Sequence, residues 1–199
     1  METIIISAGY SSRMGHNKAL LDFEGKKIID ILLNKLFPLS TKLFIILGEN
    51  FSEVEDHLKQ SGKMNTAIEL VYNEDHDDGM FSSIICGFKS VSGNQPVLLQ
   101  MIDQPFVDQQ LYRKLLASVD ETGMIFQPAR MRGNELKPGH PLLFSPHFKD
   151  VILTAEKDSN LRDVIKAHEK DRKFYLTDDD TIFMNLNTPE DVREYMGRE

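Results

Sequence analysis

The sequence predicts an α/β fold of three layers, in which a doubly wound, mostly parallel sheet lies between two layers of helices. Two observations predict this class. Short apolar runs rich in β-branched residues alternate with longer segments whose apolar residues recur at helical spacing. The chain has 199 residues, of which 41% are hydrophobic, so it is long enough to bury a sizeable core in a single domain.

The first half of the chain shows the alternation most clearly. We expect buried strands at Thr3–Ile6, Lys42–Leu47, Ala67–Tyr72 and Val97–Ile102. Helices are expected between and after these strands, at Lys27–Phe37, Phe51–Gln60, Phe81–Val91 and Gln109–Val119. In such sheets, ligands bind beyond the carboxyl ends of the strands. The loop after Ile6 and the side chain of Asp103 are therefore expected at the ligand-binding edge.

The second half is less regular. An apolar segment at Met124–Ala129 leads into a loop rich in Gly, Pro and Arg that ends at Gly139. After an apolar PLLF segment we expect helices around Phe148–Leu153 and Leu161–His168, and then two short strands. Thr188 is expected to cap a last helix, which begins with proline and acidic residues. No linker or repeat divides the sequence, so we expect one domain over the whole chain.

Composition excludes several function classes. The formal net charge of −8 argues against broad binding to nucleic acid or to an anionic membrane surface. No apolar run approaches the roughly 20 residues of a membrane span, and the first residues lead directly into a strand. The single cysteine, Cys86, has no cysteine partner for a disulfide or a zinc site. We therefore expect a cytoplasmic protein with no membrane or nucleic-acid partner.

The segment IIISAGYSSRMGHNK suggests a polyanion site. Gly9 and Gly15 allow backbone N–H groups to approach phosphate closely, and Arg13 and Lys18 supply positive charge. The spacing fits neither the phosphate loop that ends in Gly-Lys-Ser/Thr nor the G-x-G-x-x-G dinucleotide fingerprint. The loop could wrap a triphosphate, and the simpler alternative is a polar turn after the first strand.

Two further segments carry polar residues at the ends of expected elements. In MIDQPF, Asp103 follows a buried strand, where a carboxylate can hold Mg²⁺ together with water and phosphate oxygens. The same residue could simply begin a turn before proline. In DDGMFSSIICGF, Gly79 permits a tight turn, and Ser82 and Ser83 either contact a base or sugar or cap the next helix.

The densest cationic stretch of this acidic chain is RMRGNELKPGHPLLF. It contains Arg130, Arg132, Lys137 and His140. Such a stretch either binds an anionic substrate or forms a solvated loop.

Taken together, the four segments resemble the MobA-like nucleotidyltransferases, and among them the molybdenum cofactor cytidylyltransferases. That family tends to read A-A-G-x-S-S-R-M-G-x-x-K, G-M-x-x-S, D-Q-P and G-H-P in this order, and the resemblance spans residues 4 to about 193. It implies a Rossmann-like nucleotidyltransferase fold of the GT-A type. It also implies nucleotidyl transfer, in which an acceptor phosphate attacks the α-phosphorus of a nucleoside triphosphate and pyrophosphate leaves.

The resemblance also implies roles for particular residues. The nucleotide would be bound by the opening loop and the G-M-x-x-S segment, that is, by Ala8, Gly9, Ser12, Arg13, Lys18, Gly79, Met80 and Ser83. Arg13, Lys18 and Asp103 would be catalytic, with Asp103 as the Mg²⁺ ligand. The acceptor would be bound by Arg130, Arg132 and His140. Where cytidylyltransferases often read D-x-D-T-P-E-D, this chain has the amides Asn185 and Asn187, and we expect one of them to complete the metal site.

The choice of nucleotide rests on local features. Ala8-Gly9, the two-residue gap between Gly15 and Lys18, and the G-M-x-x-S and G-H-P segments favour CTP, whereas Asn185-x-Asn187 is familiar from the guanylyltransferase relatives. The acceptor would be molybdenum-loaded molybdopterin. Alternatives are a GTP-dependent guanylyltransferase, a sugar-1-phosphate nucleotidylyltransferase, and a non-enzymatic carrier that passes molybdenum cofactor to a client molybdoenzyme.

Overall fold

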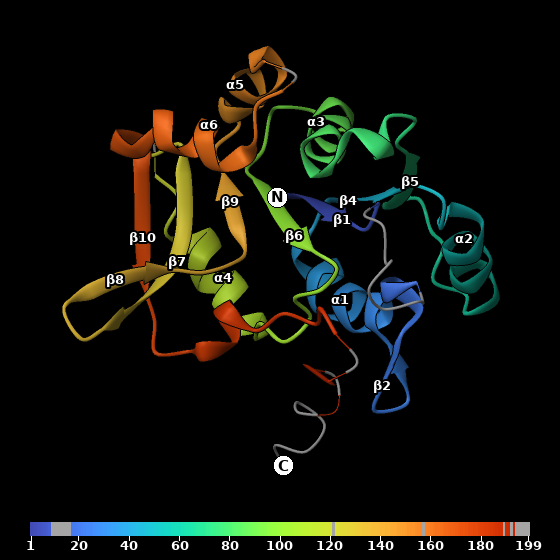
Figure 1. Cartoon of the computed structure of the whole chain (residues 1–199). Helices are drawn as coiled ribbons and strands as arrows, with labels where there is room; N and C mark the ends of the chain where they lie inside the picture. Colours follow the sequence, from blue (N-terminus) through green and yellow to red (C-terminus); the bar gives the residue numbers. More distant parts are fainter. Residues whose placement is uncertain (9–16, 121, 157, 189, 192, 194–199) are drawn as a thin grey trace.

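The central element of the protein is one twisted sheet, drawn in Figure 1 from a computed structural model. The structure describes residues 1–8, 17–120, 122–156, 158–188, 190–191 and 193. Along the sheet the strand order is β10-β7-β9-β6-β1-β4-β5, and β8 pairs with β7 outside this path. The strands are β1 (Glu2–Ile6), β4 (Lys42–Leu47), β5 (Ile68–Tyr72), β6 (Val97–Met101), β7 (Ile125–Arg132), β8 (Glu135–Pro138), β9 (Leu142–Phe144) and β10 (Arg172–Leu176).

Strand directions agree with the predicted, mostly parallel sheet. β1 is parallel to β4 and β6, β4 is parallel to β5, and β10 is parallel to β7. β9 runs antiparallel to both β6 and β7 and so joins the two parallel parts. β1 lies inside the sheet between β6 and β4, and the side chains of its residues 3–6 are buried. The carboxyl ends of β1 and β6 therefore lie side by side.

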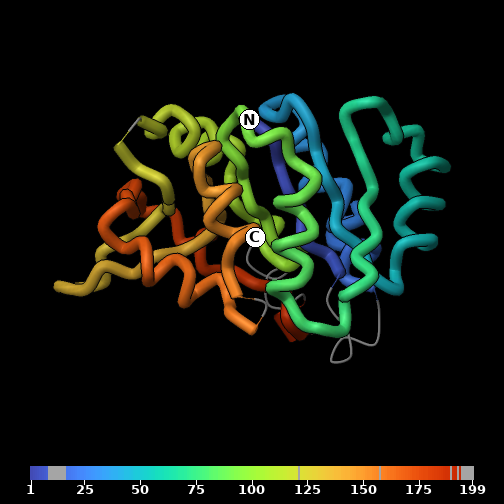
Figure 2. The backbone as a smooth tube through the Cα atoms, turned by 90° about the horizontal axis from the view of Figure 1, so that it is seen from above, coloured from blue at the N-terminus to red at the C-terminus, as the bar shows by residue number. Residues whose placement is uncertain are grey.

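Helices cover both faces of the sheet, as Figure 2 shows. The longer helices are α1 (Ile28–Leu36), α2 (Phe51–Gln60), α3 (Met80–Ser90), α4 (Gln109–Ala117), α5 (Phe148–Thr154) and α6 (Leu161–Ala167). One apolar cluster contains buried residues of α1, α2 and α4, and the other contains those of α3, α5 and α6. Each face of the strands is buried against one helical layer, which explains why the strands are apolar on both sides. These layers confirm the predicted three-layer α/β class.

Two predicted details are wrong. The stretch before Gly139 was expected to be a loop, but it forms an antiparallel hairpin of β7 and β8. Its two-residue turn starts at Gly133, whose φ of 63° suits a tight hairpin loop. Among the described residues after α6 there is one strand, β10, where two were expected. The second expected strand is a 3-10 helix, η5 (Asp180–Phe183), because the Asp179 carboxylate accepts from the backbone N–H and the hydroxyl of Thr181 and starts a helical turn.

The predicted cap at Thr188 is present. The backbone N–H of Asp191 donates to Thr188 Oγ1 over 3.1 Å, and the Asp191 carboxylate accepts from the backbone N–H groups of Asn187 and Thr188. This reciprocal arrangement is a capping box. Among the described residues, no helix combines the length and the hydrophobicity that crossing a bilayer requires.

Candidate functional site

A cavity of about 360 Å³, here named the central cavity, lies at the carboxyl ends of β1 and β6. Ile6 and Ser7 line it from β1, and Met101, Ile102 and Asp103 line it from β6. The remaining lining residues come from η1 (Lys18–Leu20), η3 (His76–Asp78), the first turn of α3 and the C-terminal segment. They include Lys18, Gly79, Met80, Ser83 and Asn187. The volume is in the range of small-molecule sites. Five predicted nucleotide-site or metal-site residues thus share this cavity with Asp103.

Lys18 lies between two oxygen acceptors in the central cavity. Its ammonium nitrogen is 3.2 Å from Asn187 Oδ1 and 3.6 Å from Asp103 Oδ2. Asn17 positions it, because the Asn17 side chain caps η1 by accepting from the backbone N–H of Ala19. Both Lys18 and Asp103 are about one-fifth exposed, so solvent screens their interaction only in part. A cation is thereby already held between a carboxylate and an amide oxygen.

The buried side-chain amide of Gln100 holds the turn that carries Asp103. The backbone N–H of Gln104 donates to Met101 O over 3.2 Å and closes a turn with Asp103 inside it. Gln100 Nε2 lies 2.9 Å from both Met101 O and Gln104 O, so its two N–H groups hold both ends of the turn. Tyr112 Oη donates to Gln100 Oε1 over 2.9 Å. All polar groups of the Gln100 side chain are therefore used to fix the turn.

Lys35 holds the next part of the same loop. Its ammonium group, on α1, donates to Pro105 O over 2.7 Å and to Val107 O over 2.9 Å. Burial lowers the pKa of Lys35 from its ordinary value, while the negative charges of Asp108 and Asp179 act in the opposite direction. The Asp103 loop is thus anchored to α1 as well as to α4, so the carboxylate has a rigid support.

The C-terminal segment contacts the Asp103 turn directly. The backbone N–H of Leu186 donates to Asp103 O over 2.7 Å. Asn185 and Asn187, which flank Leu186, have different hydrogen-bond partners. Asn185 Oδ1 accepts from Gln104 Nε2, whereas Asn187 Oδ1 lines the central cavity and accepts from Lys18. Of the two amides that the sequence offered as metal ligands, Asn187 is the one whose oxygen shares the cavity with Asp103.

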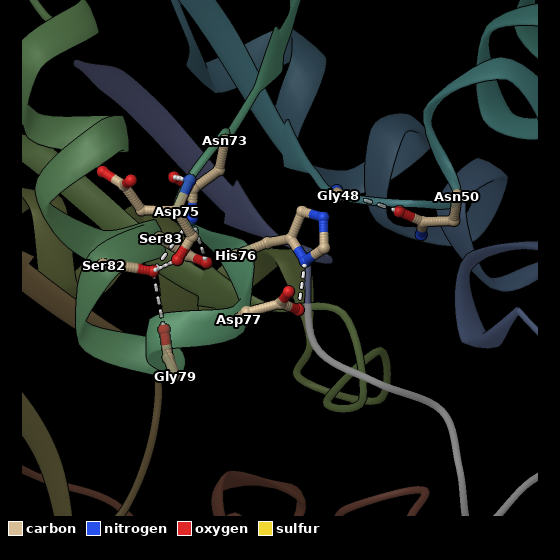
Figure 3. A network of polar contacts seen from close by, with 9 residues as sticks. All are labelled: Gly48, Asn50, Asn73, Asp75, His76, Asp77, Gly79, Ser82 and Ser83. Carbon is tan, nitrogen blue, oxygen red and sulfur yellow. Dashed lines mark hydrogen bonds and ion pairs between the residues drawn. The ribbon is translucent and has the colours of Figure 1, made fainter.

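The opposite wall of the central cavity is the beginning of α3, drawn in Figure 3. Gly79 has φ 91° and ψ −176°, a conformation that only glycine adopts readily, and it brings the chain into α3. Asn73 Nδ2 donates to the hydroxyls of Ser82 and Ser83, each over 3.0 Å. Ser82 Oγ in turn lies 2.7 Å from Asp75 O and 2.8 Å from Gly79 O. This network fixes the first turn of α3 beside the cavity.

The two serines therefore have different roles. Ser82 is engaged with its own loop and does not line the central cavity, while Ser83, 2% exposed, lines it. His76 and Asp77 also line the cavity, and His76 Nδ1 lies 3.0 Å from Asp77 Oδ1, as Figure 3 shows. The DHDD run just before Gly79 gave a sequence signal for these two residues, which the motif analysis did not use.

The donor set fits Mg²⁺ that is held partly by substrate. In the described residues, no three His, Cys, Asp or Glu side chains form a cluster that could hold a metal by themselves. Asp103 and Asn187 provide hard oxygens on either side of the Lys18 ammonium group. Mg²⁺ commonly takes one or two protein oxygens and completes its shell with phosphate oxygens and water. The central cavity meets that requirement.

A second cavity, here named the lateral cavity, lies between α6 and the strands β7 and β9. It has a volume of about 430 Å³ and is lined in part by Gln127, His140, Leu142, Arg162 and Lys166. His140 lines the lateral cavity, where burial lowers its pKa from 6.5 and the nearby Asp103 charge acts in the opposite direction. Leu142 pairs with Leu99 of β6, so the chain just before Leu142 runs along the end of β6 toward Asp103.

Arg130 and Arg132, predicted to bind the acceptor with His140, lie elsewhere. Both pair with Asp180 of η5: Arg130 Nη1 is 2.6 Å from Asp180 Oδ2, and Arg132 Nη2 is 3.1 Å from Asp180 Oδ1. The Arg132 guanidinium also stacks over the Phe183 ring at 4.6 Å. Neither arginine lines the central or the lateral cavity. The structure does not bring them together with Lys18 and Asp103.

The remaining predicted residues belong to the opening loop. Ala8 is 5% exposed and belongs to the core cluster beneath α3. Gly9, Ser12 and Arg13 lie outside the described residues. Sequence reasoning missed the residues that support Asp103 from the core, as well as Arg162 and Lys166. A buried glutamine in a strand and two cations one helical turn apart were the available signals.

The sequence pattern that defines the MobA-like NTP transferase domain matches residues 3–172. This stretch contains every residue of the lateral cavity and all of the central cavity except Asn187.

Two relatives are similar over nearly their whole length. The molybdenum cofactor cytidylyltransferase of Escherichia coli (strain K12) is 25% identical over 192 residues, which cover 96% of this chain and 93% of that protein. The molybdenum cofactor guanylyltransferase of Ectopseudomonas mendocina (strain ymp) is 26% identical over 199 residues, which cover 94% of this chain and 87% of that protein. The names of these relatives differ in the nucleotide, so the similarity does not select a base.

A solved structure has the same fold. It is a protein of Mycobacterium tuberculosis H37Rv in complex with manganese, and it superimposes with a TM-score of 0.77 at 18% identity. The superposition covers 100% of this chain and 98% of that chain. Identity this low supports the common fold alone.

Proposed function

Because the chain belongs to the MobA-like NTP transferase family, we propose that it transfers CMP from CTP to the terminal phosphate of molybdenum-loaded molybdopterin and releases pyrophosphate. The single observation that carries this proposal is the convergence of Lys18, Asp103 and Asn187 in the central cavity. A cation, a carboxylate and an amide oxygen at the carboxyl end of a parallel sheet suit a triphosphate with a divalent metal.

The nucleotide would lie between the two walls of the central cavity. Its triphosphate would lie toward Lys18 and Asp103, and its nucleoside toward the first turn of α3, where Gly79, Met80 and Ser83 line the cavity. Ser83 is fixed by Asn73, so its hydroxyl is a preorganised hydrogen-bonding group. Ala8, Gly9, Ser12 and Arg13 would complete the nucleotide site from the opening loop.

The reaction needs no protein nucleophile. A phosphate oxygen of the acceptor forms a bond to the α-phosphorus, and the bond from that phosphorus to the bridging oxygen breaks, so pyrophosphate leaves with the electron pair. Lys18 would donate hydrogen bonds to the phosphate oxygens on which charge develops, and Arg13 would support it. The rigid turn below Asp103 keeps the carboxylate in place while the reactants are aligned. Mg²⁺, held by Asp103 and Asn187, would neutralise negative charge on the triphosphate.

The choice of CTP over GTP rests on Ala8-Gly9 and on the short gap before Lys18. GTP is the second candidate, because Asn185-x-Asn187 is typical of guanylyltransferases and because relatives of both kinds match this chain. A carrier that only binds the cofactor and delivers it to a client molybdoenzyme is the third. The carrier would have no need for Lys18, Asp103 and Asn187 to converge.

The decisive experiment measures the product. The purified protein is incubated with Mg²⁺, molybdenum-loaded molybdopterin and either CTP or GTP, and the dinucleotide and the pyrophosphate are quantified. We expect cytosine dinucleotide and stoichiometric pyrophosphate. Guanine dinucleotide as the main product would replace CTP by GTP. Tight binding of the cofactor without any pyrophosphate release from either nucleotide would support the carrier instead.

A further inference from the structure

The lateral cavity carries unused positive charge. Arg162 and Lys166 are four residues apart on α6, so they lie on the same face of the helix, and both line the cavity. Within the part of the chain that the structure describes, neither side chain makes an ion pair or a hydrogen bond, although the chain as a whole has a net charge of −8. By contrast, Arg130 and Arg132 are already paired with Asp180.

The other walls of the lateral cavity are largely apolar. Pro138, Leu142, Leu161 and Ile165 supply apolar surface. The side-chain amide of Gln127 is already hydrogen-bonded within the protein: its Nε2 donates to Gly139 O, and its Oε1 accepts from the Arg172 guanidinium. The cavity therefore combines apolar walls with two cations that have no ion-pair partner among the described residues. Its other charged lining residues, Glu169 and Arg172, pair with each other. Its volume of about 430 Å³ lies in the range for a small-molecule ligand.

The position of the lateral cavity connects it to the reacting groups. His140 lines it two residues before Leu142, which pairs antiparallel with Leu99 of β6, so the chain at His140 runs beside the end of β6 that leads into Asp103. Gly139 fixes this junction, because a Cβ there would lie 2.6 Å from the Ile182 side chain and 2.7 Å from its carbonyl oxygen. The backbone N–H of His140 donates to that same carbonyl over 2.9 Å. A ligand in the lateral cavity could thus extend past His140 to the central cavity.

From these observations we infer that the lateral cavity holds the body of the acceptor, an anionic phosphate ester of a flat heteroaromatic ring, and that Arg162 and Lys166 are its specificity-determining cations. The inference rests on the proposed function, since it locates the acceptor of the same reaction. It moves the cationic part of the acceptor site from Arg130 and Arg132 to α6. His140 remains at the junction, next to the phosphate that reacts.

The test removes the two charges and measures each substrate separately. The double variant Arg162→Ser/Lys166→Ser should raise KM for the molybdopterin acceptor at least tenfold and leave KM for the nucleotide within twofold. The matched control is Arg113→Ser/Lys114→Ser, which removes the same charge from exposed positions of α4, on the other face of the sheet. The control should leave both KM values within twofold. An unchanged acceptor KM in the α6 variant, or an equal rise in the control, would overturn the inference.

A binding measurement separates this inference from the proposed function. Titration with 6-hydroxymethylpterin monophosphate, followed by pterin fluorescence, should give an affinity that weakens at least tenfold in the α6 variant and falls as salt is added. Inorganic phosphate should bind more weakly than the pterin phosphate. Equal affinity for the two, or no difference between wild type and variant, would contradict the inference. A wild-type protein that binds the pterin in this charge-dependent way but forms no dinucleotide would refute the proposed transfer and leave the cavity assignment standing.

Discussion

Tyr112 Oη donates a 2.9 Å hydrogen bond to Oε1 of Gln100, at a point where both side chains are almost completely buried. Burial raises the pKa of the Tyr112 hydroxyl, so it keeps its proton and acts as a donor throughout the ordinary pH range. Through Gln100, this bond orients the two N–H groups that hold the Asp103 turn. A residue in the core of α4 thereby supports a carboxylate in the central cavity.

Tyr112→Phe should weaken this support without changing the shape of the core. Gln100 Oε1 would be left buried without a donor, which costs about 1–3 kcal/mol of folding stability. For a domain of this size, the melting temperature should fall by about 2–4 °C for each kcal/mol. We expect the Mg²⁺ concentration for half-maximal turnover to rise as well. The exposed Tyr72→Phe is the control, and equal melting temperatures for the two variants would refute the role of the hydroxyl.

Asp103→Asn should abolish most activity. The substitution keeps the size of the side chain but removes the carboxylate that lies 3.6 Å from the Lys18 ammonium group, and Mg²⁺ sites with few carboxylates depend strongly on each one. We expect a loss of about 100-fold or more in turnover, with a melting temperature close to that of the wild type. Wild-type turnover with the same Mg²⁺ midpoint would mean that the metal is bound elsewhere.

The two C-terminal amides should respond differently. Asn187→Ala should raise the Mg²⁺ midpoint, and Asn187→Asp should lower it, because a second negative charge next to Asp103 strengthens cation binding. Asn185→Ala should instead reduce thermal stability, since it leaves the buried Gln104 amide without its acceptor. Direct Mn²⁺ titration of the protein without nucleotide provides a second measurement. If Asn185→Asp alone tightens Mn²⁺ binding, the assignment of the two amides must be reversed.

Lys18→Ala should reduce kcat/KM by about 10²–10³, which is the order seen when one electrostatic contact to a developing charge is lost. Lys18→Arg should recover part of this loss because it keeps the charge. Lys26→Ala removes an exposed lysine from β3 (Lys26–Lys27) and should leave kcat/KM unchanged. Turnover of Lys18→Ala within threefold of the wild type would exclude Lys18 from transition-state stabilisation.

His140 should make stability depend on pH. Burial lowers its pKa from 6.5, so below that value the unfolded chain binds the proton before the folded protein does. Stability is therefore unaffected above pH 6.5 and is lost as the pH falls from 6.5 toward the lowered pKa. The variant His140→Gln should not show this loss of stability at low pH. The measurement compares the melting temperatures of variant and wild type from pH 8 to pH 5. Parallel curves over that range would show that His140 does not carry the effect.

Sequence patterns predicted the fold class and several of the residues that the structure brings together in the central cavity. Continuous apolar runs such as Lys42–Leu47 identified strands buried on both faces, and they form parallel strands because each is covered by helices on both sides. Short local motifs of the sequence contain Lys18, Gly79, Ser83 and Asp103, so these residues could be identified without knowledge of long-range contacts. Parallel strands end at one edge of the sheet, so these segments meet there.

Only the tertiary structure decided which distant groups are paired and which are left available. The cationic stretch after Ala129 looked like an acceptor site, but Arg130 and Arg132 are engaged by Asp180, 48 or more residues away in sequence. The sequence predicted a helix around Leu161–His168 without singling out Arg162 and Lys166, which line a cavity together with His140. The sequence could not tell which of Asn185 and Asn187 is the metal ligand. In the structure Asn185 accepts from Gln104, whereas Asn187 accepts from Lys18 in the central cavity. Charge pairing depends on long-range contacts, and local periodicity carries no information about those contacts.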